Sequence, residues 1–109
     1  MNYLLIKHQD IIHRVKLDDI CYIASIPDAS HMIRIVTVDR EYKLFGKLQD
    51  FQAQAGSILT RCSRGLLVHP DHVTSIAPKT RTLYFDNDQH DSQTISRAYL
   101  RDFLRIWKQ

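Results

Sequence analysis

Two arginines stand three residues apart in the stretch LTRCSRGLLVHP, which covers residues 59–70. Arg61 and Arg64 flank a thiol and a hydroxyl, and the nearest acid along the chain is Asp71. A guanidinium group carries a planar fork of donors, which can clamp a phosphate or read the O6 and N7 acceptors of guanine. This pair therefore predicts an anionic partner.

Two more residues with similar chemistry stand where structural elements are predicted to meet. His31 follows the turn sequence PDAS, and Arg97 lies in the first turn of a predicted C-terminal helix. The helix dipole disfavours a cation in that turn, so a group outside the helix should compensate Arg97. Side chains in such places can project from a rigid scaffold into a groove, which makes His31, Arg64 and Arg97 candidate nucleic-acid contacts.

The distribution of charge favours the same class of partner. The formal net charge is +3, and residues 1–60 hold seven Lys or Arg against seven Asp or Glu, whereas residues 61–109 hold eight against five. The whole excess therefore lies in the C-terminal part, and a polyanion is the partner that such a surface attracts.

Length and composition predict one domain over residues 1–109. The chain is 44% hydrophobic and 25% charged, which is typical of a soluble globular protein that can bury its own core. It has no Pro- or Gly-rich linker, no repeat and no low-complexity block. No apolar run approaches the roughly 20 residues that span a bilayer, and the N-terminus lacks a secretory pattern, so we expect a cytoplasmic location and no membrane partner.

The sequence shows no pattern typical of catalysis or of cofactor binding. A Gly-rich phosphate loop and a nucleophile elbow are both missing, so we expect no enzymatic activity and no cofactor. A metalloenzyme could use Cys62, His69 and His72, but no second close pair of ligands accompanies them, and we expect no metal site. Cys21 and Cys62 are predicted to be packed free thiols. A redox switch would require an exposed Cys62 whose pKa the flanking arginines lower.

The hydrophobic pattern predicts ten short strands and two helices. A helix over residues 47–55 ends at Gly56, and a second begins after Ser96 as N-cap and carries an apolar stripe that includes Phe103 and Trp107. Most connections are too short for a crossover helix, so the sheets should be antiparallel. The strands are expected near residues 3–6, 11–16, 20–25, 32–38, 41–45, 59–61, 66–68, 73–76, 83–86 and 93–95.

With these elements in place, the sequence resembles the LytTR family of bacterial DNA-binding domains. That family lies at the C-terminus of response regulators of two-component systems, which control quorum sensing, bacteriocin and virulence genes. The resemblance implies a mainly β fold, a LytTR-like arrangement of short antiparallel sheets with a short middle helix and a C-terminal helix. It departs from the family pattern at Ser63, Gly65 and His69, where the family often has His, Ser and Asn. The segments that carry it, in order, are LDDICYIAS, SHMIRIVT, REYKLFGKLQDF, ILTRCSRGLLVHPDHVTSI and TISRAYLRDFL.

The resemblance also implies roles for individual residues. Loops would enter successive major grooves on one side of the duplex, with base contacts at His31, Arg64 and Arg97, the three positions already singled out. Neighbouring residues would contact phosphates, which orient the protein but carry little sequence information. We expect these contacts at Lys43, Lys47, Arg61, Ser63, Tyr99 and Arg101.

The implied partner is double-stranded promoter DNA with direct-repeat half-sites, which a homodimer could occupy. A receiver domain is a further expected partner if the chain is a piece of a longer regulator. The alternative hypothesis is a small β protein-interaction module, whose strand edges and basic loops bind an acidic protein or peptide.

Overall fold

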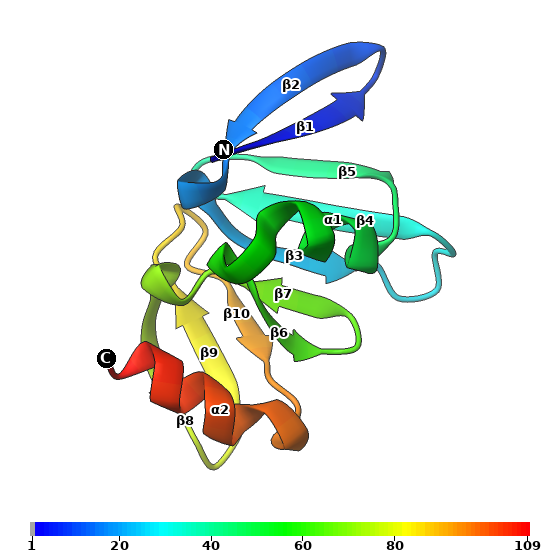
Figure 1. Cartoon of the computed structure of the whole chain (residues 1–109). Coiled ribbons are helices and arrows are strands. Elements are labelled where there is room, and N and C mark those ends of the chain that lie inside the picture. Colours follow the sequence, from blue (N-terminus) through cyan, green and yellow to red (C-terminus); the bar gives the residue numbers. More distant parts are fainter. Residues whose placement is uncertain (1) are drawn as a thin grey trace.

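The computed structural model describes residues 2–109, and in that range the chain forms ten strands and two α-helices (Figure 1). Every predicted strand is present, and no strand end differs from its prediction by more than two residues. The helices are α1 (Leu48–Ala55) and α2 (Arg97–Trp107). The strands are β1 (Tyr3–His8), β2 (Ile11–Lys16), β3 (Ile20–Ser25), β4 (Met32–Thr37), β5 (Glu41–Phe45), β6 (Thr60–Ser63), β7 (Leu66–Val68), β8 (Val73–Ala77), β9 (Thr82–Phe85) and β10 (Ser92–Thr94).

The strands form three antiparallel sheets, which confirms the predicted fold class. The central sheet has five strands in the order β5-β4-β3-β7-β6, and a three-stranded sheet has the order β10-β9-β8. The third sheet is the β1–β2 hairpin. Strands that follow one another in the chain and pair in a sheet are joined by short connections. These connections lie at the ends of the sheets, where they can carry exposed side chains.

Both faces of the central sheet are covered by separate hydrophobic clusters. One cluster packs under α1 and the β1–β2 hairpin, and the other packs under the three-stranded sheet and α2. The middle strand β3 has the sequence ICYIAS, and its first five residues are buried. A continuous apolar run of this kind is what a strand with two covered faces requires.

Helix α2 closes the second cluster through the predicted apolar stripe. Phe103 is fully buried, and the Trp107 indole Nε1 donates to the Val73 carbonyl oxygen at 2.9 Å. Ser96 occupies the N-cap position, as predicted, but its side chain makes no capping hydrogen bond. Its backbone N–H instead donates to the Cys62 carbonyl oxygen at 2.9 Å, which fixes the start of α2 beside β6.

The molecule is longer in one direction, with extents of 42 × 30 × 26 Å. Among residues 2–109 there is no helix that is both long and apolar enough to pass through a bilayer.

Candidate nucleic-acid interface

Three connections project from the same side of the molecule, the right-hand side of Figure 1. These are the β3–β4 connection, the β6–β7 turn and the segment between β10 and α2. The first two carry His31 and Arg64, the third leads into Arg97 as the first residue of α2, and all three residues are exposed. The fold therefore brings the three predicted base-contacting residues to one side.

Short backbone hydrogen bonds hold the β3–β4 connection in place. The Met32 amide donates to the Ala29 carbonyl oxygen at 3.1 Å, and the Gly46 amide donates to the His31 carbonyl oxygen at 2.8 Å. His31 has a φ of 61°, in the left-handed region that few residues other than glycine adopt. The imidazole is thus presented from a fixed backbone, with the end of β5 directly behind it.

The β6–β7 turn is held by contacts from two sides. The Ser63 hydroxyl oxygen accepts from the Gly65 amide at 3.2 Å, and the Ser25 amide donates to the Gly65 carbonyl oxygen at 2.9 Å. A Cβ at Gly65 would lie 3.3 Å from the Ser25 Cβ, which is closer than most real contacts. Glycine at this position therefore lets the turn approach β3 closely, and the turn presents Arg64 at its tip.

Arg61 has a different environment from Arg64. Its Nη1 donates to the Arg64 carbonyl oxygen at 2.7 Å, and its Nε donates to Gln52 Oε1 at 3.1 Å. Neutral oxygens of the protein already accept hydrogen bonds from Arg61, so the fold gives it internal partners, and the predicted anionic partner of Arg61 stays a prediction. Arg61 connects the turn to α1 and so positions Arg64.

A shared hollow connects two of the three predicted base-contacting residues. His31 and Arg64 line a cavity of about 330 Å³ together with Lys47 and Arg61. Arg97 begins the helix whose N-cap is bonded to β6, on the other side of the same turn. The three side chains thus follow one another along one side of the molecule, with His31 at the hollow, Arg64 on the turn and Arg97 at the start of α2.

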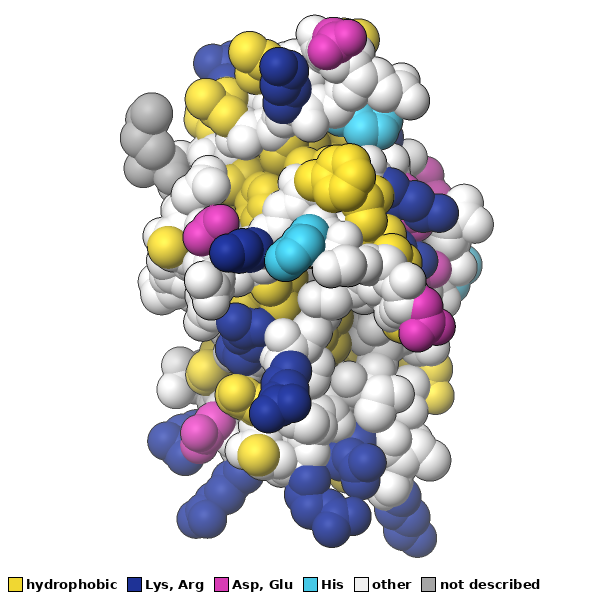
Figure 2. Space-filling view, turned by 90° about the vertical axis from the view of Figure 1, so that its right-hand side faces the viewer, with side chains coloured by type: hydrophobic (Ala, Val, Ile, Leu, Met, Phe, Trp, Pro, Cys, Tyr) yellow, Lys and Arg dark blue, Asp and Glu magenta, His cyan; other side chains and the backbone are white. Residues whose placement is uncertain are grey.

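These side chains are not neutralised by the fold. Within residues 2–109, His31, Arg64 and Arg97 take part in no ion pair and donate no side-chain hydrogen bond; the same holds for Lys47 and Arg101. Figure 2 shows this side of the molecule: Lys and Arg side chains gather along its lower part, whereas acidic side chains are scattered singly.

The other predicted phosphate-contacting residues differ in the contacts that they already make within the protein. Lys43 is 3.7 Å from Glu41 Oε2 in an exposed ion pair, which costs little to open. Ser63 uses its oxygen within the turn but retains its hydroxyl proton for an acceptor. Tyr99 is exposed in the first turns of α2.

The cysteines do not meet the conditions for a redox switch. Cys62 is fully buried, and burial raises the pKa of its thiol to about 12. Burial and the neighbouring Asp86 raise the pKa of Cys21 to about 12 as well. Both residues are free, packed thiols, as predicted.

The metal-ligand set considered from the sequence is not assembled in the part of the chain that the structure describes. The ligand atoms that converge there belong to Cys21, His72 and Asp86, not to Cys62 and His69. His72 Nδ1 lies 2.9 Å from Asp86 Oδ1, so this group already has an internal partner. Cys62 is buried in the cluster under α2, and burial keeps its thiol protonated, whereas a metal binds the thiolate.

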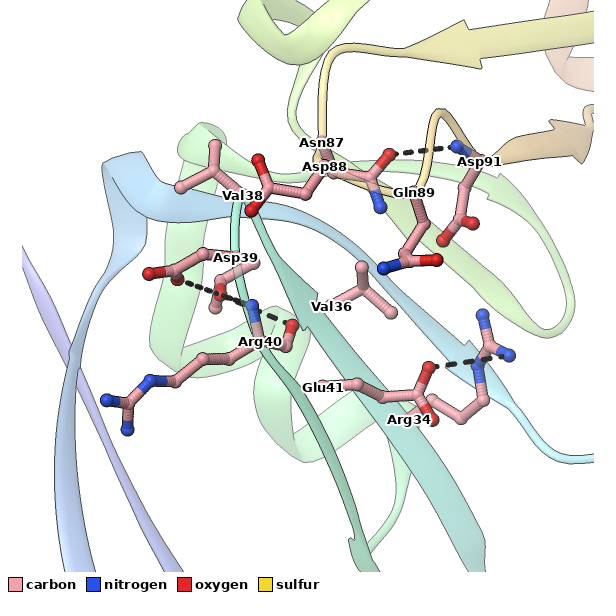
Figure 3. Close-up of a pocket in the computed structure, with 11 residues that line it drawn as sticks. Arg34, Val36, Val38, Asp39, Arg40, Glu41, Asn87, Asp88, Gln89 and Asp91 are labelled. Atoms are coloured by element: carbon pink, nitrogen blue, oxygen red, sulfur yellow. Dashed lines mark hydrogen bonds and ion pairs between the residues drawn. The ribbon is translucent and has the colours of Figure 1, made fainter.

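Another cavity lies elsewhere and has the opposite charge. It measures about 460 Å³ and is formed by the β4–β5 turn and the β9–β10 connection (Figure 3). Arg34 and Arg40 are outnumbered by four carboxylates there: Asp39, Glu41, Asp88 and Asp91. Since the β4–β5 turn lies at the opposite end of β4 from His31, this cavity does not belong to the cationic side.

Sequence reasoning did not single out Phe45, the most exposed large hydrophobic residue of the described chain. Its exposed fraction is 78%, and it pairs across the strands with Met32 on the same side as His31. The available signal was an aromatic residue at the end of an edge strand, immediately before Gly46.

Comparisons with known proteins identify relatives of this chain. Residues 10–108 match a family model described as the LytTr DNA-binding domain. The structure is similar to the LytTr DNA-binding domain of a Bacillus cereus protein described as a methyl-accepting/DNA response regulator. The TM-score is 0.75 at 18% sequence identity, and the match covers 97% of this chain and 96% of that one. No curated protein matches the sequence at a significant level.

Proposed function

Because the chain belongs to the LytTR family of DNA-binding domains, we propose that it binds double-stranded promoter DNA through the side that carries His31, Arg64 and Arg97. DNA binding in transcription regulation is the general function of this family, which is not a catalytic one. One observation supports the assignment to this side: three exposed, unpaired side chains with the chemistry to contact bases come from two connections and the start of α2.

The proposed mode of binding is the insertion of these connections into successive major grooves. Successive major grooves on one side of B-DNA are about 34–36 Å apart. The longest dimension of the protein is 42 Å, so the molecule can reach both grooves when its long axis follows the duplex. Loops anchored at both ends lose little entropy on binding, and each can therefore hold its side chain in register with a base edge.

In this arrangement, residues around the three loops contact phosphates and orient the protein. We assign this role to Lys43, Lys47, Ser63, Tyr99 and Arg101. Arg61 retains only Nη2 for a phosphate, because its other nitrogens donate within the protein, and its main role in our proposal is to hold the turn. Each phosphate contact steepens the salt dependence by about 0.9 log units per log unit of salt.

The wider context follows from the family. We propose that the domain acts in a response regulator of a two-component system in the cytoplasm, of the kind that controls quorum sensing. Its sites would be direct repeats occupied by two copies, and a receiver domain would control their association.

A protein-interaction module is the second candidate, and the outer side of the β1–β2 hairpin is the observation that favours it. Leu5 and Ile12 are exposed there beside Arg14, whose guanidinium lies 4.5 Å from the centre of the Tyr3 ring. Such an apolar and cationic surface fits an acidic protein or peptide.

Fluorescence anisotropy with promoter duplexes and mixed-sequence competitor separates the two functions. Wild-type protein should prefer its own site, and Arg64→Ala should lose about 1–3 kcal/mol of affinity, with the loss concentrated at one base identity. Arg40→Ala is the matched control, because it removes an exposed arginine from the acidic end of the molecule. Absence of any sequence preference in the wild type, or equal losses for both variants, would reject the proposed function.

A further inference from the structure

A second hollow lies next to the one that His31 lines. Its volume is about 370 Å³, and it is formed by the turn end of the β1–β2 hairpin and the end of β5. Met32 lines both hollows, so the two are neighbours on one side of the molecule. The lining residues are Lys7, His8, Gln9, Met32, Lys43, Leu44 and Phe45, and we call this surface the hairpin-tip hollow.

The hairpin is fixed over β5 and does not hang free. The His8 ring packs edge-on against Tyr42 of β5, with ring centroids 6.0 Å apart, and His13 of β2 packs against the same tyrosine at 5.1 Å. The two turn residues, Gln9 and Asp10, have φ values of 53° and 64°. A two-residue turn with positive φ at both positions ordinarily uses Asn or Gly, so Gln9 is held in a strained conformation.

The side chains that line the hairpin-tip hollow are of the kinds that bind nucleic acids. Phe45 is exposed over most of its surface, and the exposed Lys7 and Lys43 line the same hollow. An aromatic ring together with cations is a combination that binds bases and phosphates. The upper part of the side shown in Figure 2 carries more hydrophobic side chains than its lower part, where Lys and Arg dominate.

Two acids stand near this surface, and neither closes it. Glu41 pairs with Lys43 at 3.7 Å at the surface, and Asp10 lies in the hairpin turn with no ion pair among the described residues. Exposed ion pairs contribute little to stability, so a phosphate can displace Glu41 from Lys43.

We propose that the hairpin-tip hollow is a fourth DNA contact of this chain, beyond the groove that the β3–β4 connection enters. Phe45 contacts an apolar base edge, for which the thymine methyl is the available group in the major groove, and Lys7 and Lys43 contact the phosphates on either side. Three of the lining residues, Lys7, His8 and Gln9, precede the range that matches the family model. The contact is therefore carried in part by residues outside the family pattern. The inference rests on the proposed function, because it extends the same interface.

The test measures binding to duplexes by fluorescence anisotropy at several salt concentrations. Lys7→Gln should lower the salt slope by about 0.9. Lys16→Gln is the matched control, because both lysines are exposed on the same face of one hairpin but at its opposite ends, and it should leave the slope unchanged.

Phe45 is tested by a pair of changes in the protein and in the DNA. Phe45→Ala should weaken binding roughly fivefold to tenfold, since about 50 Å² of apolar surface would remain in water. Replacing thymines in the flanking segment by uracil should weaken wild-type binding by about threefold to fivefold and should not weaken binding by Phe45→Ala further. Because Phe45 is exposed, the thermal melt of Phe45→Ala should match that of the wild type, and Phe45→Leu should bind with intermediate affinity.

The outcomes separate this inference from the proposed function. If the wild type prefers its site while Lys7→Gln, Phe45→Ala and Phe45→Leu bind like it, the fourth contact is refuted and the three-loop interface stands. A wild type with no affinity for DNA would reject the interface as a whole. If the hairpin-tip hollow binds a protein and not DNA, the three variants should likewise bind DNA as the wild type does.

Discussion

Arg61 gives the sharpest test of how the interface is built. Its guanidinium donates to the Arg64 carbonyl oxygen and to Gln52 Oε1, so it joins the β6–β7 turn to α1. If this is its main role, Arg61→Met should act through the stability and the shape of the turn. If instead its main role is to contact a phosphate, the same change should act through the salt dependence of DNA binding.

The structure sets the expected size of the effect on stability. Arg61→Met keeps the alkyl part of the side chain and removes hydrogen bonds of 2.7 Å and 3.1 Å, together with a long one of 3.5 Å from Nη1 to the Ser63 carbonyl oxygen. Hydrogen bonds that involve a charged group contribute about 1.5–3 kcal/mol each, but the shorter one here is exposed and must be discounted. We expect a loss of about 2 kcal/mol in the free energy of unfolding, or about 10 °C in Tm for a chain of this size.

The assay combines urea unfolding with the salt dependence of DNA binding. Arg61→Met should be destabilised and should bind DNA more weakly, with a salt slope close to that of the wild type. Lys47→Met is the control: it is exposed on the same side without an ion pair, so it should keep full stability and lower the slope by about 0.9. A double-mutant cycle with Gln52→Ala should show a coupling energy of at least about 0.5 kcal/mol.

One pattern of results refutes this reasoning. If Arg61→Met unfolds at the same urea concentration as the wild type and its salt slope falls by about 0.9, Arg61 contacts a phosphate and does not hold the turn. The sequence-based expectation for Arg61 would then be correct, and the internal hydrogen bonds would be exchanged for the phosphate on binding.

Three further predictions concern the scaffold. Burial, with a smaller effect from His72, lowers the pKa of His69 below its ordinary 6.5. The unfolded chain therefore gains a proton first as pH falls below about 6.5, and stability falls with it; His69→Asn should reduce the loss that urea unfolding measures between pH 7 and 5.5. Trp107→Ala should cost about 3 kcal/mol, and Trp107→Phe should cost less, about 1 kcal/mol, because it keeps an aromatic ring in the cluster while losing the hydrogen bond to Val73, as thermal melts would show. Because burial raises the pKa of Cys62 to about 12, a thiol reagent at pH 8 should label it only after urea is added.

The fold was largely predictable because its signals are local. The uninterrupted apolar run of β3 and the stripe on α2 each follow from the period of one element, and turn residues separate the strands clearly. The order of strands in the sheets is not local, since β3 pairs with β7 across about forty residues of chain. The missing side-chain cap at Ser96 has the same origin: a backbone bond to Cys62 in another element already holds the start of the helix.

The candidate site was predictable in its exposed residues and not in its internal contacts. His31, Arg64 and Arg97 could be singled out because each stands at an element boundary, and whether they contact bases remains a prediction. The partner of Arg61 is Gln52 on α1, nine residues upstream, together with a backbone carbonyl that no residue type reveals. Neutral acceptors of this kind leave no charge pattern in the sequence, so a pairing rule based on acids misses them.

The acidic cavity at the other end of the molecule limits how the protein can meet DNA. Strand β4 joins the two ends, and its five steps of about 3.4 Å separate the β3–β4 connection from the β4–β5 turn by about 17 Å. The Debye length at physiological salt is about 8 Å, so the carboxylates around Asp39 and Asp88 do not cancel the positive field at His31 and Arg64. They do repel phosphates that approach their own end. The separation of charge therefore favours orientations in which the cationic side meets the duplex, which is what the proposed binding mode requires.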